Sequence, residues 1–173
     1  MKNQTNIRKT AFSAILTALS VTLIFLGGLF DILDLTVSAA CSLITAAAIV
    51  EVGIKYSALI YFAASALSFV IFPMTTAGIY YAAFFGYYPI ARRYIKKLPK
   101  TISAVLRFAL FNAVMIIIML VFKEIFALQN EPASMYVLLA AAGNVFFFCY
   151  DLVLDKFDII YKHKLKKIFR FKI

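Results

Sequence analysis

The sequence predicts an all-α integral membrane protein with roughly six transmembrane helices. Of its 173 residues, 64% are hydrophobic and only 15% are charged, and the mean hydropathy is +0.93. Soluble domains are only about half apolar. The chain also lacks the alternation of apolar and polar residues that is typical of a membrane β-barrel. We therefore expect one membrane domain over residues 1–173, with a basic C-terminal tail.

Long apolar segments follow one another with short connections, and each can cross a bilayer as a helix of roughly 20 residues. The segments cover residues 10–29, 35–51, 54–72, 75–94, 101–123 and 133–154. Basic residues precede the first segment, as in a secretory signal, but its length predicts a helix that is retained. Pro89 lies inside the fourth segment and removes a backbone donor, so we expect that helix to be kinked.

Basic residues collect at alternate connections. Apart from Lys123, every lysine and arginine lies in the N-terminal flank, at Lys55, between residues 92 and 107, or in the tail from Lys156 onward. By the positive-inside rule, this distribution predicts a multi-pass protein of the cell membrane with both termini in the cytoplasm. We attribute the net charge of +10 to anchoring at an anionic lipid surface and expect no nucleic-acid partner.

Motifs for catalysis and cofactor binding are absent from the sequence. It has no phosphate-binding loop of the Walker type, no Gly-x-Ser-x-Gly elbow and no His-Glu-x-x-His pair. The single histidine, His163, lies among lysines of the tail. We therefore predict no enzyme activity, no cofactor and no metal site, and we assign any ATP hydrolysis to partner subunits.

Three aspartates in the sixth segment and its extension favour a different interpretation. Asp151, Asp155 and Asp158 are spaced i, i+4 and i+7, which places them on one helix face. Such a face could hold a divalent cation for an enzyme that acts on lipid or polyprenyl substrates. Local ion pairing is the alternative, and the basic residues within reach are Lys156, Lys162 and either Arg92 or Arg93.

Polar and aromatic side chains at similar depths predict a ligand pocket near the outer face. Two asparagines lie near the middle of the fifth and sixth segments, where an amide needs a partner, although hydrogen bonding between helices would satisfy them equally well. Tyrosines and aspartates lie at the outer ends. The candidate substrate-binding residues are Asp31, Asp34, Tyr80, Tyr81, Asn112, Tyr136 and Asn144.

The first segment carries a row of small residues at Ala11, Ala14 and Ala18. The Ala14-x-x-x-Ala18 spacing gives a small-xxx-small face, which permits close approach of another helix backbone. This face is our candidate for docking a partner, and packing within the chain is the alternative.

These features together resemble the substrate-binding S component of an energy-coupling-factor (ECF) transporter. The resemblance covers the whole chain and rests on the basic N-terminus before Ala14-x-x-x-Ala18, the connection Asp31-Ile-Leu-Asp34-Leu, and the basic stretches after the fourth and sixth segments. It implies uptake of a vitamin or related small molecule, which is bound near the outer face. It also implies docking of the first helix on a membrane coupling subunit that is served by two ATPases.

Two other classes of function remain open from the sequence. One is the small membrane enzyme that would use the Asp151 face. The other is a non-catalytic membrane scaffold whose alanine-rich helices bind a partner.

Overall fold

The computed structural model describes residues 2–29, 33–73, 75–125 and 133–161, and this part of the chain is helical without any strand. The helices are α1 (Lys2–Gly28), α2 (Asp34–Glu51), α3 (Ile54–Ile71), α4 (Thr76–Tyr80), a π-helix η2 (Tyr81–Phe85), α5 (Tyr88–Ile95), α6 (Lys100–Ile125) and α7 (Ala133–Ile160). The prediction of an all-α protein is therefore confirmed for the described residues.

Five helices are long and apolar enough to cross a membrane within the described ranges. Their spans are Asn6–Gly28, Asp34–Glu51, Ile54–Ile71, Lys100–Leu120 and Val137–Ile160. Four of these closely match predicted segments, and the fifth begins inside the predicted segment 133–154 but ends later, at Ile160. The structure is thus that of a helical protein suited to a lipid bilayer.

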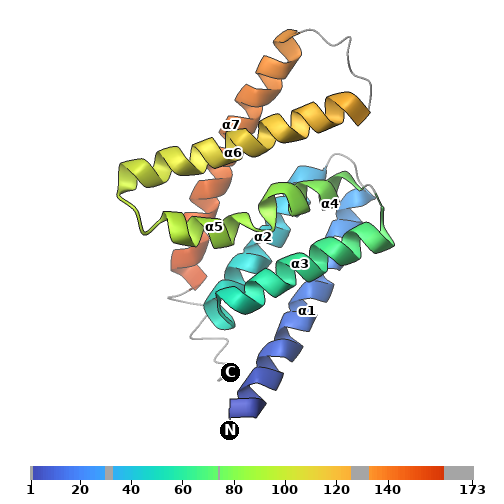
Figure 1. Cartoon of the computed structure of the whole chain (residues 1–173), viewed down its shortest axis with the longest axis vertical. Coiled ribbons are helices and arrows are strands. Elements are labelled where there is room, and N and C mark those ends of the chain that lie inside the picture. Colours follow the sequence, from blue (N-terminus) through green and yellow to red (C-terminus); the bar gives the residue numbers. More distant parts are fainter. Residues whose placement is uncertain (1, 30–32, 74, 126–132, 162–173) are drawn as a thin grey trace. The chain divides into compact units, whose positions relative to one another are not determined.

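The predicted fourth span, residues 75–94, is not one continuous helix. It is divided into α4, η2 and α5, and Figure 1 shows the chain bending between these short pieces. The amide of Gly86 donates to the carbonyl of Tyr81 at 2.7 Å, an i→i−5 bond in place of the usual i→i−4 bond. Pro89 then contributes no amide hydrogen to the following turn. The fourth segment is therefore bent, as Pro89 predicts, but its regular α-helix is interrupted already at Tyr81, where η2 begins.

The chain divides into two compact units. The first unit comprises Met1–Ala91 and Leu154–Ile173, and the second comprises Arg92–Val153. Each unit has its own internal packing. The expectation of one membrane domain over the whole chain stays a prediction.

In the first unit, α1, α2 and α3 pack on one another through small residues. The α1 face that is buried carries Ser13, Thr17, Ser20 and Ile24. Gly27 continues this face, where an added Cβ would lie 2.9 Å from the Val37 side chain of α2. Hydroxyl groups are tolerated in this interface because most donate within their own helix, as Thr17 does to the Ser13 carbonyl at 2.9 Å. Small side chains let the helix backbones approach closely.

A short turn of Val52 and Gly53 connects α2 to α3. Gly53 has φ of +92°, a conformation that disfavours side chains with a Cβ atom. Its amide donates to the Ala48 carbonyl at 3.2 Å, which closes the end of α2. The turn positions α3 to pack against α1 and α2.

In the second unit, α6 and α7 pair as antiparallel helices. The Phe111 and Phe147 rings stack with centroids 4.5 Å apart, and Phe108 meets Phe147 edge-on at 5.1 Å. Gly143 faces Met115, whose terminal methyl would lie 3.0 Å from an added Cβ. As residue numbers rise along α6, those of their α7 partners fall, which defines the antiparallel register.

Candidate functional site

A buried cluster of hydroxyl groups lies in the first unit where α1, α2 and η2 meet. The side chains of Ser20, Thr45 and Tyr81 are fully buried there. The Tyr81 hydroxyl lies 3.4 Å from Thr45 Oγ1, which is long for a hydrogen bond between hydroxyls. Ser20 Oγ is buried without a hydrogen-bond partner among the described residues. Cys41 Sγ closes the cluster by donating to the Ser20 carbonyl at 3.6 Å. The cluster is polar but incompletely hydrogen-bonded, which is uncommon for buried groups.

The π-helix explains how a further tyrosine reaches the same region. Because Gly86 donates to the Tyr81 carbonyl, the Ala82 carbonyl is not its acceptor. Tyr61 Oη donates to that Ala82 carbonyl at 2.9 Å. The Tyr61 ring lies against Gly86, where a Cβ atom would be 2.4 Å from the ring. A glycine at residue 86 is therefore required for this packing.

Asp34 and Tyr80 are the predicted binding residues that the first unit brings together. Asp34 is the first residue of α2, and only 5% of its surface is exposed. Its carboxylate is close enough to interact electrostatically with the partly exposed Tyr80. A carboxylate at the start of a helix is stabilised by the helix dipole. Tyr81, the neighbour of Tyr80, points into the buried hydroxyl cluster and has no exposed surface.

Asn112 and Asn144 bind each other across α6 and α7 in the second unit. Each amide nitrogen donates to the other side-chain oxygen, at 2.9 and 3.0 Å. Each also donates to a backbone carbonyl one turn earlier in its own helix, that of Phe108 or Ala140. Both amide groups therefore have all their donors satisfied within the protein.

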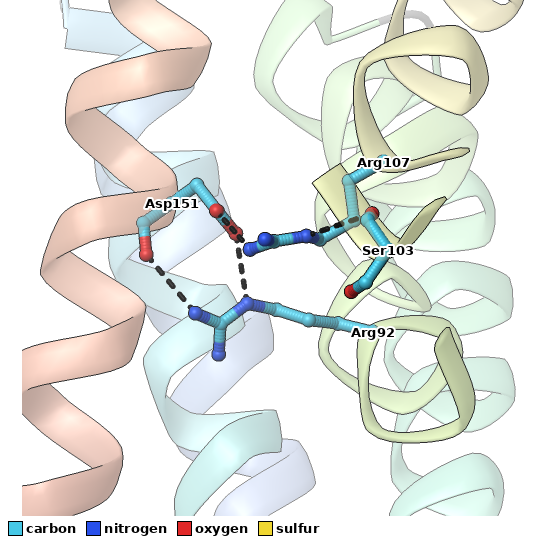
Figure 2. Close-up of polar contacts among 4 residues, drawn as sticks. All are labelled: Arg92, Ser103, Arg107 and Asp151. Carbon is cyan, nitrogen blue, oxygen red and sulfur yellow. Dashed lines mark hydrogen bonds and ion pairs between the residues drawn. The ribbon is translucent and has the colours of Figure 1, made fainter. Parts of the chain in front are cut away.

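An ion-pair cluster joins the start of the second unit to both of its long helices. Arg92 donates through Nε to one carboxylate oxygen of Asp151 at 2.8 Å and through Nη2 to the Asp151 carbonyl at 3.1 Å. Arg107 donates through Nη1 to the other carboxylate oxygen and through Nε to the Ser103 carbonyl. Figure 2 shows the two guanidinium groups converging on Asp151. This arrangement confirms Arg92 as an ion-pair partner of the aspartate face.

Within the described ranges, no three His, Cys, Asp or Glu side chains are grouped so that they could hold a metal ion. Asp151 has a guanidinium group at each carboxylate oxygen. Asp155 and Asp158 also have interaction partners in the structure. A cation at this face would have to displace arginine from Asp151.

The two sides of α1 differ sharply in exposure. Ala11, Ala14 and Ala18 are exposed, whereas Ser13 and Thr17, on the opposite side, are buried in the first unit. Large apolar side chains flank the alanines, and Ile15 is 64% exposed. The alanine row therefore takes no part in the packing of the first unit.

The remaining predicted binding residues are less fully described. Asp31 lies outside the described residues, and only the backbone of Tyr136, within α7, is described. Among the described candidates, Asn112 and Asn144 are hydrogen-bonded to each other in the second unit, and the Asp34 charge acts on Tyr80 in the first.

Sequence reasoning missed the roles of Ser20, Thr45 and Arg107. The i, i+4, i+7 spacing of Ser13, Thr17 and Ser20 was a readable signal of a polar face on α1. Arg107 was readable as a charge inside an apolar segment, where ionisable residues are costly and need partners.

The fold and these sites define an α-helical protein with five helices of membrane-spanning length and polar contacts within each unit. Comparison of the chain with protein-family models, with curated proteins and with solved structures gave no significant match.

Proposed function

We propose that this chain is the substrate-binding S component of an energy-coupling-factor uptake transporter. In this proposal it captures a vitamin or related small molecule near the outer face of the cell membrane. A membrane coupling subunit and two ATPases then complete the transporter. The apolar helices of spanning length and the absence of an ATP-binding motif from the sequence support this assignment.

The exposed alanine row of α1 carries the proposal. Helix association in lipid depends on close packing, because the hydrophobic effect offers little between apolar helices there. Ala11, Ala14 and Ala18 leave the backbone of α1 accessible, while the opposite side of the helix is already packed. A small-residue face left open in this way suits a partner helix. We assign it to the coupling subunit.

The topology in this proposal has six crossings with both termini in the cytoplasm. Residues 76–95 supply the fourth crossing as a discontinuous helix made of α4, η2 and α5. Discontinuous helices occur in transporters where the backbone lines a binding site. The basic residues from Arg92 to Lys100 anchor the end of this crossing at the inner surface.

For substrate binding, Asp34 and Tyr80 are favoured over the asparagine pair. Tyr80 is partly exposed and lies within electrostatic range of Asp34, so a ligand that reached both would meet a carboxylate and a phenol. Asn112 and Asn144 donate only to groups of the protein, so ligand binding there would require the exchange of existing hydrogen bonds. The Asp34 end of α2 is therefore the first place to test.

The test is affinity purification from the native host in mild detergent, with mass spectrometry of the proteins and small molecules that co-purify. We expect recovery of a membrane coupling subunit, two ATPases and a retained metabolite. Ala14→Leu and Ala18→Leu should reduce recovery of the coupling subunit, because the larger side chains hold the partner backbone away.

The matched control is Ala63→Leu, which makes the same change at an exposed alanine of α3. It should leave recovery of the coupling subunit unchanged. The absence of a coupling subunit and ATPases from the wild-type sample would contradict the transporter proposal. Equal losses from Ala63→Leu and Ala14→Leu would contradict the docking role of α1.

A further inference from the structure

Arg107 has hydrogen-bonding capacity that the described protein does not use. A guanidinium group carries five N–H donors. Arg107 directs one to the Ser103 carbonyl and another to Asp151, and its remaining N–H groups have no acceptor among the described residues. Its side chain is 15% exposed, so these donors have access to the surroundings. At membrane depth an unsatisfied charged donor is costly, which favours an acceptor from outside the chain.

Asp151 is already shared between two guanidinium groups. Arg92, which is 3% exposed, pairs with one carboxylate oxygen, and Arg107 pairs with the other. The Asp151 carboxylate therefore positions Arg107, but its negative charge is shared with Arg92. Arg107 is also fixed through Ser103, one turn earlier in α6. A guanidinium that is held at two points has a fixed direction for its remaining donors, which lowers the entropy lost when they bind an anion.

The charges near this end of the second unit favour an anion. The segment that runs from α5 into α6 contains only basic charged residues, namely Arg92, Arg93, Lys96, Lys97, Lys100 and Arg107. Arg107 lies about two turns, or about 10 Å, from the first residue of α6. That depth is within reach of a lipid headgroup, because long basic side chains extend toward the membrane surface.

We propose that Arg107, held by Asp151 and Ser103, binds the phosphate group of an anionic membrane lipid. Phosphate matches the planar donor fork of arginine, and its negative charge complements the surrounding lysines and arginines. Basic sites between transmembrane helices are suited to anionic headgroups. This inference is independent of the transport proposal, because it requires neither a transported substrate nor a coupling subunit.

The experiment uses the full chain, purified in neutral detergent and stripped of lipid. Native mass spectrometry and thermal unfolding are measured with phosphatidylglycerol, with phosphatidylcholine and with inorganic phosphate. We expect phosphatidylglycerol to bind and to raise the unfolding temperature more than phosphatidylcholine does. Arg107→Gln should weaken phosphatidylglycerol binding by about tenfold or more, the loss of a charged hydrogen-bonded contact.

Arg93→Gln is the matched control, because it removes the same charge from a neighbouring exposed residue. It should weaken binding by about fivefold or less, as expected for a general surface attraction. Arg107→Lys keeps the charge, and so preserves an ion pair with Asp151 if Arg107→Gln fails to fold. We expect it also to bind phosphatidylglycerol more weakly than wild type, because lysine lacks the planar donor fork.

The phosphate arm distinguishes the source of the ligand. An Arg107-dependent shift with phosphatidylglycerol alone supports a lipid headgroup, and one with inorganic phosphate supports the same phosphate chemistry from a soluble source. Equal losses in Arg107→Gln and Arg93→Gln would overturn the proposal, since the attraction would then be spread over the basic segment. Full affinity in Arg107→Lys, or no Arg107-dependent shift with any probe, would also overturn it.

Discussion

Asn112 and Asn144 exchange two side-chain hydrogen bonds between α6 and α7, at 2.9 and 3.0 Å. The same helices are joined by the stacked rings of Phe111 and Phe147 and by the ion pair of Arg107 with Asp151. All of these contacts lie in the second unit and follow one antiparallel register. Polar and aromatic contacts therefore alternate along the pairing of α6 with α7.

The asparagine pair should be energetically coupled. Asn112→Ala leaves the Asn144 amide without its interhelical partner, and we expect it to lower the free energy of unfolding by about 0.6–2 kcal/mol. The double variant Asn112→Ala with Asn144→Ala should cost less than the sum of the two single variants, because it leaves no unpaired amide. Unfolding of the purified protein in detergent and denaturant measures this cycle. Strict additivity would show that the two amides act independently.

Asp151→Asn should be more damaging than either asparagine variant. It removes the negative charge from between two guanidinium groups that are largely buried. We expect a loss of about 3 kcal/mol, which is the scale for breaking a buried ion pair on one side. Thermal unfolding compared with wild type measures the loss. An unchanged unfolding temperature would mean that the cluster contributes little to stability.

A metal titration of the wild type is the control for this interpretation of Asp151. Because both of its carboxylate oxygens are engaged by arginine, we expect calcium, magnesium and manganese to leave the unfolding temperature unchanged. A clear stabilisation by one of these ions would instead favour the enzyme class considered from the sequence.

Gly86→Ala tests packing against helix propensity. In an exposed helix, alanine stabilises by about 1 kcal/mol relative to glycine. Here the new Cβ would lie 2.4 Å from the Tyr61 ring and 2.9 Å from the Tyr81 carbonyl oxygen. We expect a net loss of about 1–3 kcal/mol, as for overpacking of a core. Tyr61→Leu in the same chain should recover part of that loss, since the ring contact is relieved and the backbone contact stays. A gain in stability from Gly86→Ala alone would contradict the π-helix packing.

Tyr161 makes stability depend on pH in the alkaline range. Burial, together with the nearby Glu51 carboxylate, raises the pKa of Tyr161 from 10.0 to about 12. The folded state therefore holds the Tyr161 proton more tightly than the unfolded state. Its contribution is fully present below pH 10 and is lost as the pH rises toward 12. In this pH range, we expect the free energy of unfolding of Tyr161→Phe to fall less steeply with rising pH than that of the wild type.

Ultraviolet titration of tyrosinate measures the pKa behind this prediction, with Tyr161→Phe identifying the residue by difference. Glu51→Gln should lower the Tyr161 pKa, and burial should still keep it above its ordinary value. A Tyr161 that titrates near pH 10 in the folded wild type would contradict its burial, and a Tyr161 pKa that is unchanged in Glu51→Gln would contradict the proximity to Glu51.

The sequence by itself determined the class of structure. Long apolar segments can satisfy their backbone hydrogen bonds in lipid only as helices or closed barrels, and no barrel pattern is present. Five of the predicted segments accordingly match long apolar helices. The position of Pro89 in the sequence also predicted that the fourth segment is not a straight helix. The sequence likewise indicated that Asn112, Asn144 and Asp151 are polar groups that need partners.

Only the tertiary structure decided which groups Asn112, Asn144 and Asp151 interact with. Asn112 and Asn144 face each other because α6 and α7 pair in one particular register and rotation, and a periodic apolar sequence is compatible with several. The choice of Arg92 and Arg107 for Asp151 depends on the same register. Packing likewise turned the serine face of α1 inward and left Ala14 exposed, and it placed the Tyr61 ring against Gly86. Helix formation is a local property of the chain, whereas partner choice depends on how whole helices pack.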